Sequence, residues 1–270
     1  MVVILRDNPF FDELATEHRG WLLAFGPQYL RNWEKVVNAD EEAGMSEAVM
    51  RRFLQRSNVT VYPNEDLTGA EQRPDFRCAY VGDTFYVEVT CISTTKATEE
   101  TGLNPEKPGS TNYRPLNDSV FEACRAKAPQ CGNLDNPALV AVCTFHGPAA
   151  MLSFSKGRVD MLLTGETKIT WNIDIQTGSQ VGETFQSTDF RSAAFLRPNK
   201  QNGFGFARNS ISGLLLCGVG FEPPNVVGIL HPNPARPFRP QVFPHTAFCE
   251  VQIDNASGTL STTWIGGGDE

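Results

Sequence analysis

The stretch from Arg73 to Ile92 constrains the fold most, because it has the pattern of a β-hairpin. Apolar side chains alternate with polar or small ones on both sides of Gly82 and Asp83, which is the period of two that paired strands show. A Gly-Asp pair is also an expected two-residue turn. We therefore expect two antiparallel strands joined at Gly82 and Asp83, with one apolar and one polar face.

A two-residue turn at this place fixes which residues of the polar face lie opposite each other. Asp75 then pairs with Thr90, and Arg77 pairs with Glu88. Asp75 and Glu88 become diagonal neighbours with Cα atoms roughly 7 to 8 Å apart, a separation at which two carboxylates can share a cation. A four-residue loop about the same turn keeps this register, and a three-residue loop breaks it. The alternative is a solvent-facing polar row in which Arg77 and Glu88 form an ion pair.

Length and composition place the chain among proteins with one substantial core. Its 270 residues fit one large domain. No apolar run approaches the ~20 residues that span a bilayer, and the first six residues are too short for a secretory segment, so we expect a cytoplasmic protein. Seven cysteines without a Cys-x-x-Cys motif indicate buried thiols instead of disulfides or zinc ligands. The formal charge of −8 argues against non-specific coating of nucleic acid, but it leaves room for a local basic groove.

Before the hairpin, the periodicity predicts three helices and a short strand. The elements are helices at 12–25, 27–37 and 46–56 and a strand at 59–62. Ser46 is the expected N-cap of the third helix. Glu47 falls on the same side of that helix as Met50 and Leu54, so its carboxylate borders the core. The alternative for Glu47 is a first-turn acid favoured by the helix dipole.

After the hairpin, the pattern predicts a mixed sheet with helices. The elements are an exposed loop at 93–114, a helix at 117–128, a strand buried on both faces at 138–145, an interrupted helix at 148–164, strands at 168–175, 214–219 and 226–230, and a last hairpin at 247–253 and 259–265. The fold class is therefore α/β, with an α+β mixed sheet. We expect an N-terminal helical segment (1–44), a core (45–146) and a β-rich C-terminal extension packed on that core (147–270).

The order of acidic and basic residues along these elements has a known counterpart. In sequence they are Glu47 on a helix, Pro74-Asp75, Glu88-Val89-Thr90 on a strand, and Lys127 and Gln130 at the end of a helix that precedes the buried strand. Between about Met45 and Phe145 this order resembles the restriction-endonuclease-like superfamily of PD-(D/E)XK nucleases, which has an αβββαβ core.

The resemblance implies a metal-dependent nuclease. It implies Mg²⁺, with Mn²⁺ as a substitute, held by the carboxylates of Asp75, Glu88 and Glu47 and the carbonyl of Val89, since magnesium prefers oxygen ligands. The substrate would be a phosphodiester of nucleic acid, DNA in preference to RNA, in prokaryotic defence or repair. The resemblance also allows a homodimer, or a complex with another protein of a defence system.

Thr90 departs from the pattern, because the family has a lysine at this position. Lys127 on the following helix is the expected replacement, with Gln130 near it, and Lys96 is the second choice. A lysine lying along the surface is the alternative for Lys127. The departure also leaves open a catalytically inactive module that binds nucleic acid or a protein.

The segment 197–208 mixes cations, glycines and aromatic residues, which could contact a nucleic-acid backbone and stack on bases. Lys200 and Arg208 are its candidate nucleic-acid-binding residues. The alternative is an ordinary loop anchored by Phe204 and Phe206. A third possibility, an enzyme using His231 or His245 with a cysteine, lacks a nucleophile motif.

Overall fold

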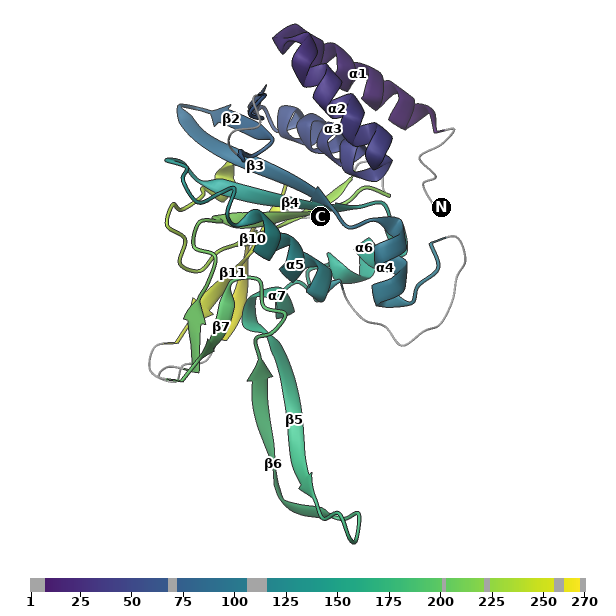
Figure 1. Cartoon of the computed structure of the whole chain (residues 1–270). Helices are drawn as coiled ribbons and strands as arrows, with labels where there is room; N and C mark the ends of the chain where they lie inside the picture. The colour runs from purple at the N-terminus through teal and green to yellow at the C-terminus, as the bar shows by residue number, and fades with distance from the viewer. Residues whose placement is uncertain are drawn as a thin grey trace.

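One mixed sheet of eight strands lies at the centre of the molecule (Figure 1). The computed structural model describes residues 8–67, 72–105, 116–200, 203–220, 224–254 and 260–267. The strand order is β1-β2-β3-β4-β9-β10-β11-β12. These strands span Thr60–Pro63 (β1), Phe76–Tyr80 (β2), Asp83–Cys91 (β3), Ala138–Thr144 (β4), Gly213–Gly218 (β9), Asn225–Leu230 (β10), Ala247–Ile253 (β11) and Leu260–Gly266 (β12). The expected α/β class with a mixed sheet is confirmed.

Helices cover both faces of this sheet. One face carries α1 (Pro9–Phe25), α2 (Pro27–Ala39) and α3 (Glu41–Arg56), and the other carries α4 (Thr94–Thr101), α5 (Asn117–Lys127), α6 (Gly147–Ser153) and α7 (Met161–Thr164) (Figure 1). Strand β4 separates the two cores, because Leu139 and Ala141 point into the first and Val140 and Val142 into the second. Every residue of β4 is buried, as its continuous apolar run predicts. None of the described helices is both long enough and apolar enough to cross a membrane.

The predicted start of α3 is wrong by five residues. Asp40 is the N-cap, and its Oδ1 accepts a hydrogen bond of 3.0 Å from the amide of Ala43. Ser46 lies within the helix and donates its hydroxyl to the carbonyl of Glu42 at 2.7 Å. Asp is as good a cap as Ser, so the periodic apolar residues alone could not locate the first turn.

The central hairpin forms, but its turn lies one residue before the predicted one. Val81 and Gly82 are the turn residues with φ of 46° and 87°, and Tyr80 pairs with Asp83. Two positive φ values match a type I′ turn, whose twist fits that of the strands. Phe76 therefore lies opposite Val87, not opposite Val89. Because the register changes by two residues, each side chain keeps its predicted face.

The C-terminal half extends the central sheet. Strand β9 pairs in parallel with β4 along Leu139–Thr144, and β10, β11 and β12 follow it outward. Strands β9, β10, β11 and β12 of the expected C-terminal extension thus belong to the same sheet as β1 to β4. The predicted last hairpin is confirmed as the antiparallel pair β11 and β12.

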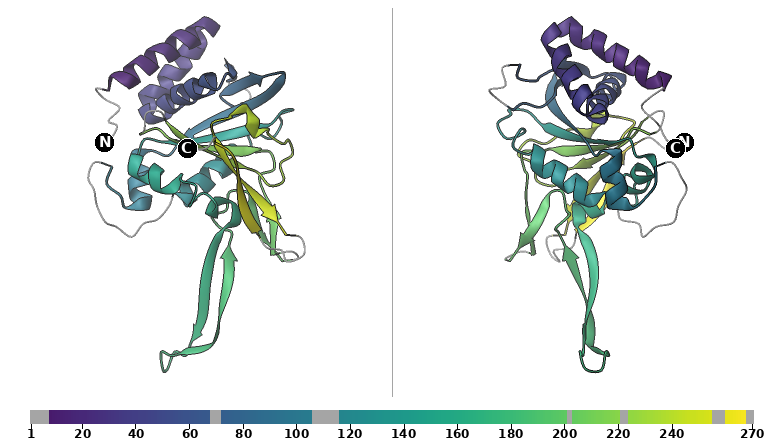
Figure 2. Two further views of the ribbon diagram at one scale, coloured as in Figure 1. Left: turned by 180° about the vertical axis from the view of Figure 1, so that it is seen from behind. Right: turned by 45° about the vertical axis from the view of Figure 1, so that its right-hand side comes forward.

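Two further strand pairs and one helix differ from the sequence prediction. Strands β5 (Glu166–Ile173) and β6 (Gln180–Asp189) form a two-stranded arm that projects from the body (Figures 1 and 2), so the expected half-buried strand is exposed. Strands β7 (Leu196–Asn199) and β8 (Gly203–Phe206) pair where a loop was the alternative. The loop expected at 93–114 contains α4, which Ser93 caps, and its residues 106–114 lie outside the described chain.

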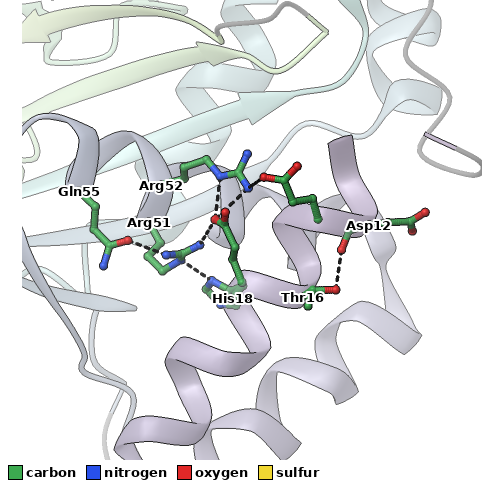
Figure 3. Close-up of polar contacts among 8 residues, drawn as sticks. Asp12, Thr16, His18, Arg51, Arg52 and Gln55 are labelled. Carbon is green, nitrogen blue, oxygen red and sulfur yellow. Dashed lines mark hydrogen bonds and ion pairs between the residues drawn. The ribbon is translucent and has the colours of Figure 1, made fainter. Parts of the chain in front are cut away.

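A buried polar network ties α1 to α3 (Figure 3). The Arg51 guanidinium donates to Nδ1 of His18 at 3.1 Å and to Oε1 of Gln55 at 2.5 Å. His18 is fully buried, with its ring centroid 4.8 Å from that of Trp33. Burial, together with the charges of Arg51 and Arg19, lowers the pKa of His18 to about 3, so the imidazole is neutral.

Candidate active site

Glu88 is a buried acid in the middle of a strand. Its side chain is 2% exposed and lies on the face of β3 that α5 covers. Oε1 accepts a hydrogen bond of 2.5 Å from the ammonium group of Lys127. Oε2 is buried and has no hydrogen-bond partner among the described residues. A buried carboxylate oxygen without a partner is costly and uncommon in folded proteins, so it calls for an explanation.

Asp75 lies beside Glu88 at the start of β2. Its Oδ2 accepts a hydrogen bond of 2.6 Å from the amide of Val89. Phe76 pairs with Val87, so the same register carried one residue further brings Asp75 opposite Glu88. The two acids are therefore direct neighbours across the hairpin, not the diagonal neighbours that the sequence predicted. For Val89 the structure places the amide against Asp75, whereas the carbonyl was the predicted ligand.

Glu47 is close enough to the two other acids for their charges to affect its ionisation. Burial raises the pKa of Asp75 to about 6. Burial and the Asp75 carboxylate raise the pKa of Glu88 to about 8 in spite of Lys127. Burial raises the pKa of Glu47 as well, and the charges of Asp75, Glu65 and Glu88 add to the effect. Glu47 on α3, Asp75 just before β2 and Glu88 on β3 thus oppose one another's ionisation.

Lys127 is the cation of this cluster. Burial by itself would lower its pKa, but the charges of Glu88, Asp75 and Glu47 outweigh burial and raise it. The side chain is 25% exposed and its Nζ reaches the buried Glu88 carboxylate. The last turn of α5 therefore points a positive charge at the Glu88 carboxylate.

Glu65 is an acid that the sequence prediction missed. It lies two residues after β1, and burial together with the Asp75 carboxylate raises its pKa. The amide of Asn32 donates a hydrogen bond of 3.4 Å to its Oε2. The only sequence signal was an acid at the end of a strand that pairs with β2, in a segment that otherwise looks like a polar loop.

Two open cavities are lined by residues that lie close in sequence to Glu88 and Lys127. Thr90 and Lys96 line one of about 610 Å³, and Tyr86 and Gln130 line another of about 630 Å³. Oε1 of Gln130 is buried without a hydrogen-bond partner in the described chain. Lys96 lies on the wall of the first cavity, and the cation in contact with Glu88 is Lys127, so the structure favours the first choice of lysine over the second.

The structure does not bring Lys200 and Arg208 to this site. Lys200 is exposed just after β7. Arg208 turns inward, donates to the carbonyl of Ala194 at 2.6 Å and lies over the Phe121 ring at 4.3 Å, and burial lowers its pKa. These internal contacts correct the expectation that Arg208 is available for nucleic acid.

His231 is held by contacts within the fold. It is buried, its Nε2 lies 2.9 Å from the carbonyl of Ala207, and its Nδ1 accepts from the amide of Asn233. His245, the other histidine candidate, is exposed. All seven cysteines are free thiols, and all but Cys91 are buried.

The carboxylate cluster offers the oxygen ligands that a hard cation prefers, but its side chains do not converge on one position. Within the described ranges, no three His, Cys, Asp or Glu side chains converge on a common metal position. Lys127 contacts one oxygen of Glu88, and the amide of Val89 donates to one oxygen of Asp75. The orphaned Oε2 of Glu88 and the carboxylate character of the set fit magnesium or manganese.

No protein-family model matches this chain, and comparison with curated proteins and with solved structures gives no significant match.

Proposed function

We propose that this protein is a magnesium-dependent nuclease that hydrolyses phosphodiester bonds, with DNA in preference to RNA as substrate. The observation that carries the proposal is the cluster of Glu47, Asp75 and Glu88 around Lys127. The four side chains come from α3, the residue before β2, β3 and α5, and their pKa values are shifted by burial and by one another. Strongly perturbed acids beside an open cavity are typical of catalytic sites.

The order of elements supports the same proposal. Helix α3 with Glu47 is followed by β1, β2 with Asp75 at its start, β3 with Glu88, α5 with Lys127 and β4. Strands β1, β2 and β3 pair antiparallel, and β3 and β4 pair in parallel. Apart from α4, which follows β3, this order agrees with the αβββαβ order expected of restriction-endonuclease-like nucleases and so supports the proposal.

The excess of buried negative charge gives a physical reason for a metal. Three carboxylates face a single ammonium group, so the cluster lacks positive charge when its acids are ionised. A divalent cation held by Asp75 and Glu88, with Glu47 at its edge, would supply that charge, polarise a phosphate and generate hydroxide near neutral pH.

Lys127 supplies a second positive charge that does not depend on metal. Phosphoryl transfer gathers negative charge on the oxygens of the transferred group, and a fixed cation nearby stabilises it. Glu88 orients the ammonium group through the 2.5 Å hydrogen bond. Thr90, in the place of the usual lysine, supplies no charge, so the cation comes from α5.

Calorimetric titration with Mn²⁺ tests the metal site. We expect the parent protein to bind Mn²⁺ and the variants Asp75→Asn and Glu88→Gln to lose this binding while keeping the circular dichroism spectrum of the parent. Glu99→Gln, on the wall of the first cavity, is the matched control and should bind like the parent. Unchanged binding in either site variant would show that the site is misplaced.

Cleavage of DNA tests the role of Lys127. Lys127→Met keeps the stem and removes the charge, so we expect cleavage to fall by roughly a hundredfold with metal affinity nearly unchanged. Lys96→Met is the control with the same chemistry on the neighbouring cavity, and it should retain activity. Full activity of Lys127→Met with loss in Lys96→Met would transfer the role to Lys96.

A second candidate function is an inactive nuclease-fold module that binds nucleic acid or a protein. The observation that favours it is Thr90 at the position of the usual lysine, together with the absence of three converging ligands in the described chain. Binding of nucleic acid without uptake of Mn²⁺ in the same titration would support this module.

A further inference from the structure

The cavity beside Tyr86 differs in chemistry from the cavity beside Thr90. The cavity beside Tyr86 is lined by the amide side chains of Asn64, Gln72, Gln130 and Asn133, by Tyr86, Pro129 and Leu134, and by the two opposite charges of Arg73 and Asp135. The charged residues that line the cavity beside Thr90 are Asp40, Glu99, Glu100, Asp118, Glu122 and the cation Lys96. A polyanion is repelled from the acidic cavity and meets no net charge in the cavity with the amides.

The lining of the amide-lined cavity includes Tyr86 and Gln130, which are close in sequence to Glu88 and Lys127 of the cluster. Tyr86 precedes Glu88 by two residues on β3 and so shares its face of the sheet. Gln130 follows Lys127 by three residues, at the turn that ends α5. A group bound between Tyr86 and Gln130 therefore lies next to the place where a phosphate would meet Lys127.

One polar atom of this cavity is buried and unpaired. Oε1 of Gln130 has no hydrogen-bond partner in the described chain, and the Asn133 amide on the same cavity wall is exposed. Buried polar atoms without partners are uncommon in folded proteins and call for an explanation. A bound ligand that donates a hydrogen bond from one flat edge would satisfy the Gln130 oxygen.

We propose that this cavity receives one unstacked nucleobase of a single-stranded substrate. Side-chain amides offer a donor and an acceptor side by side, which matches the edge of a base, and a tyrosine ring offers a stacking surface. A cavity of about 630 Å³ is of the size that encloses a small ligand, whereas a stacked and paired base inside a duplex cannot enter it. This inference rests on the proposed nuclease function and names its substrate as single-stranded.

Fluorescence anisotropy with one labelled DNA oligonucleotide, free and annealed to its complement, tests the proposal. The Asp75→Asn background prevents cleavage during the measurement. We expect the single strand to bind at least tenfold more tightly than the duplex, and Asn133→Ala to weaken single-strand binding by about tenfold. Asn172→Ala, the same substitution at an exposed site on β5, should bind like the background protein.

The tyrosine separates stacking from folding. Tyr86→Phe keeps the ring and should bind the single strand within about twofold of the background, whereas Tyr86→Leu should lose about tenfold or more. Equal affinity for duplex and single strand, or no effect of Asn133→Ala and Tyr86→Leu, would overturn the inference. If proteins that retain Asp75 cleave DNA equally well with and without the cavity substitutions, the base site is rejected and the nuclease function is kept. If the parent protein binds the single strand but cleaves no DNA, the nuclease function is rejected and the base site is kept.

Discussion

Asp75 is a single residue whose ionised side chain lowers the free energy of unfolding. Its pKa of about 6 in the folded protein is above the value of a free aspartate because of burial. A raised pKa means that ionisation of Asp75 destabilises the fold, and the loss develops as the pH rises from the unfolded value through about 6. A residue kept in such a place is typical of function at the expense of stability.

We therefore predict that Asp75→Asn stabilises the metal-free protein at pH 8. The amide keeps an oxygen that can accept the hydrogen bond from Val89, and it removes a charge whose burial costs about 2 to 3 kcal/mol. Urea unfolding in the presence of a chelator measures the gain, which should shrink as the pH falls towards 4. A variant less stable than its parent at pH 8 would contradict this account.

The sequence predicted the residues of the cluster better than their geometry. Asp75, Glu88 and Lys127 follow from alternation in the hairpin and from the stripe of the following helix. Glu65 could not be found, because its role depends on how β1 pairs with β2. Nor could the sequence show that α5 covers the polar face of the hairpin and makes Glu88 a buried acid.

At the scale of one element, the turn of the central hairpin carries a residue that does not suit its backbone. Val81 is β-branched, 88% exposed and held at a φ of 46°, a region that such residues rarely adopt. Asn-Gly is the preferred pair for a type I′ turn. Valine is not a usual turn residue, so the sequence prediction placed the turn at Gly82 and Asp83 instead of at Val81 and Gly82.

We predict that Val81→Asn stabilises the protein by about 1 kcal/mol, because asparagine tolerates the left-handed region. Urea unfolding at pH 7 measures the difference. Val81→Ala is the matched control, as it removes the exposed apolar side chain without favouring a positive φ, and its gain should be smaller. Equal gains in both variants would attribute the effect to exposure of valine instead of backbone strain.

The layer formed by α1, α2 and α3 contains a buried histidine, His18, whose protonation affects the stability of the fold. His18 has a folded pKa of about 3, below the ordinary value, so protons favour the unfolded chain. Its contribution to stability is complete above about pH 6.5 and is lost as the pH falls towards 3. Between pH 7 and pH 5 the loss is about 2 kcal/mol.

We therefore predict that His18→Gln reduces the acid sensitivity of the fold. The comparison is the difference in urea unfolding free energy between pH 7 and pH 5 in parent and variant. The His245→Gln variant, which changes an exposed histidine, is the control and should keep the difference of the parent. An unaltered pH dependence in His18→Gln would mean that His18 is protonated in the folded state.

At the scale of the whole molecule, the sequence predicted the strands of the C-terminal half but not their place. Strands β9 and β10 follow from short apolar runs, yet nothing in the runs shows that β9 adds to β4 in parallel. That pairing joins residues about 70 positions apart. Long-range parallel pairing leaves no local signal, so the extension was expected on the core instead of within its sheet.

The arm formed by β5 and β6 is the part of the molecule that the cores do not hold. Its apolar side chains are Ile169, Trp171, Ile173, Ile175, Val181 and Phe185, with exposed fractions between 49% and 99%. The two cores of the described chain include no side chain from 166–189. The arm projects away from the helices α1 to α3 in each view (Figures 1 and 2). A hairpin without further strands or a packed face adds little to the stability of a fold.

We predict that removal of Ile169–Gln186, with an Asn-Gly turn joining Lys168 to Ser187, leaves the thermal unfolding midpoint within about 2 °C of the parent. Lys168 pairs with Ser187 in the register, so the short turn closes the remaining strands. The ion pair of 2.6 Å between Lys168 and Asp189 at the base of the arm is retained. Solubility should rise, because six exposed apolar side chains are removed.

Trp171→Ser tests the same point without a deletion and should also leave the midpoint unchanged. A fall of 5 °C or more in both variants would show that the arm folds as part of the cooperative unit, and its apolar side chains would then be structural.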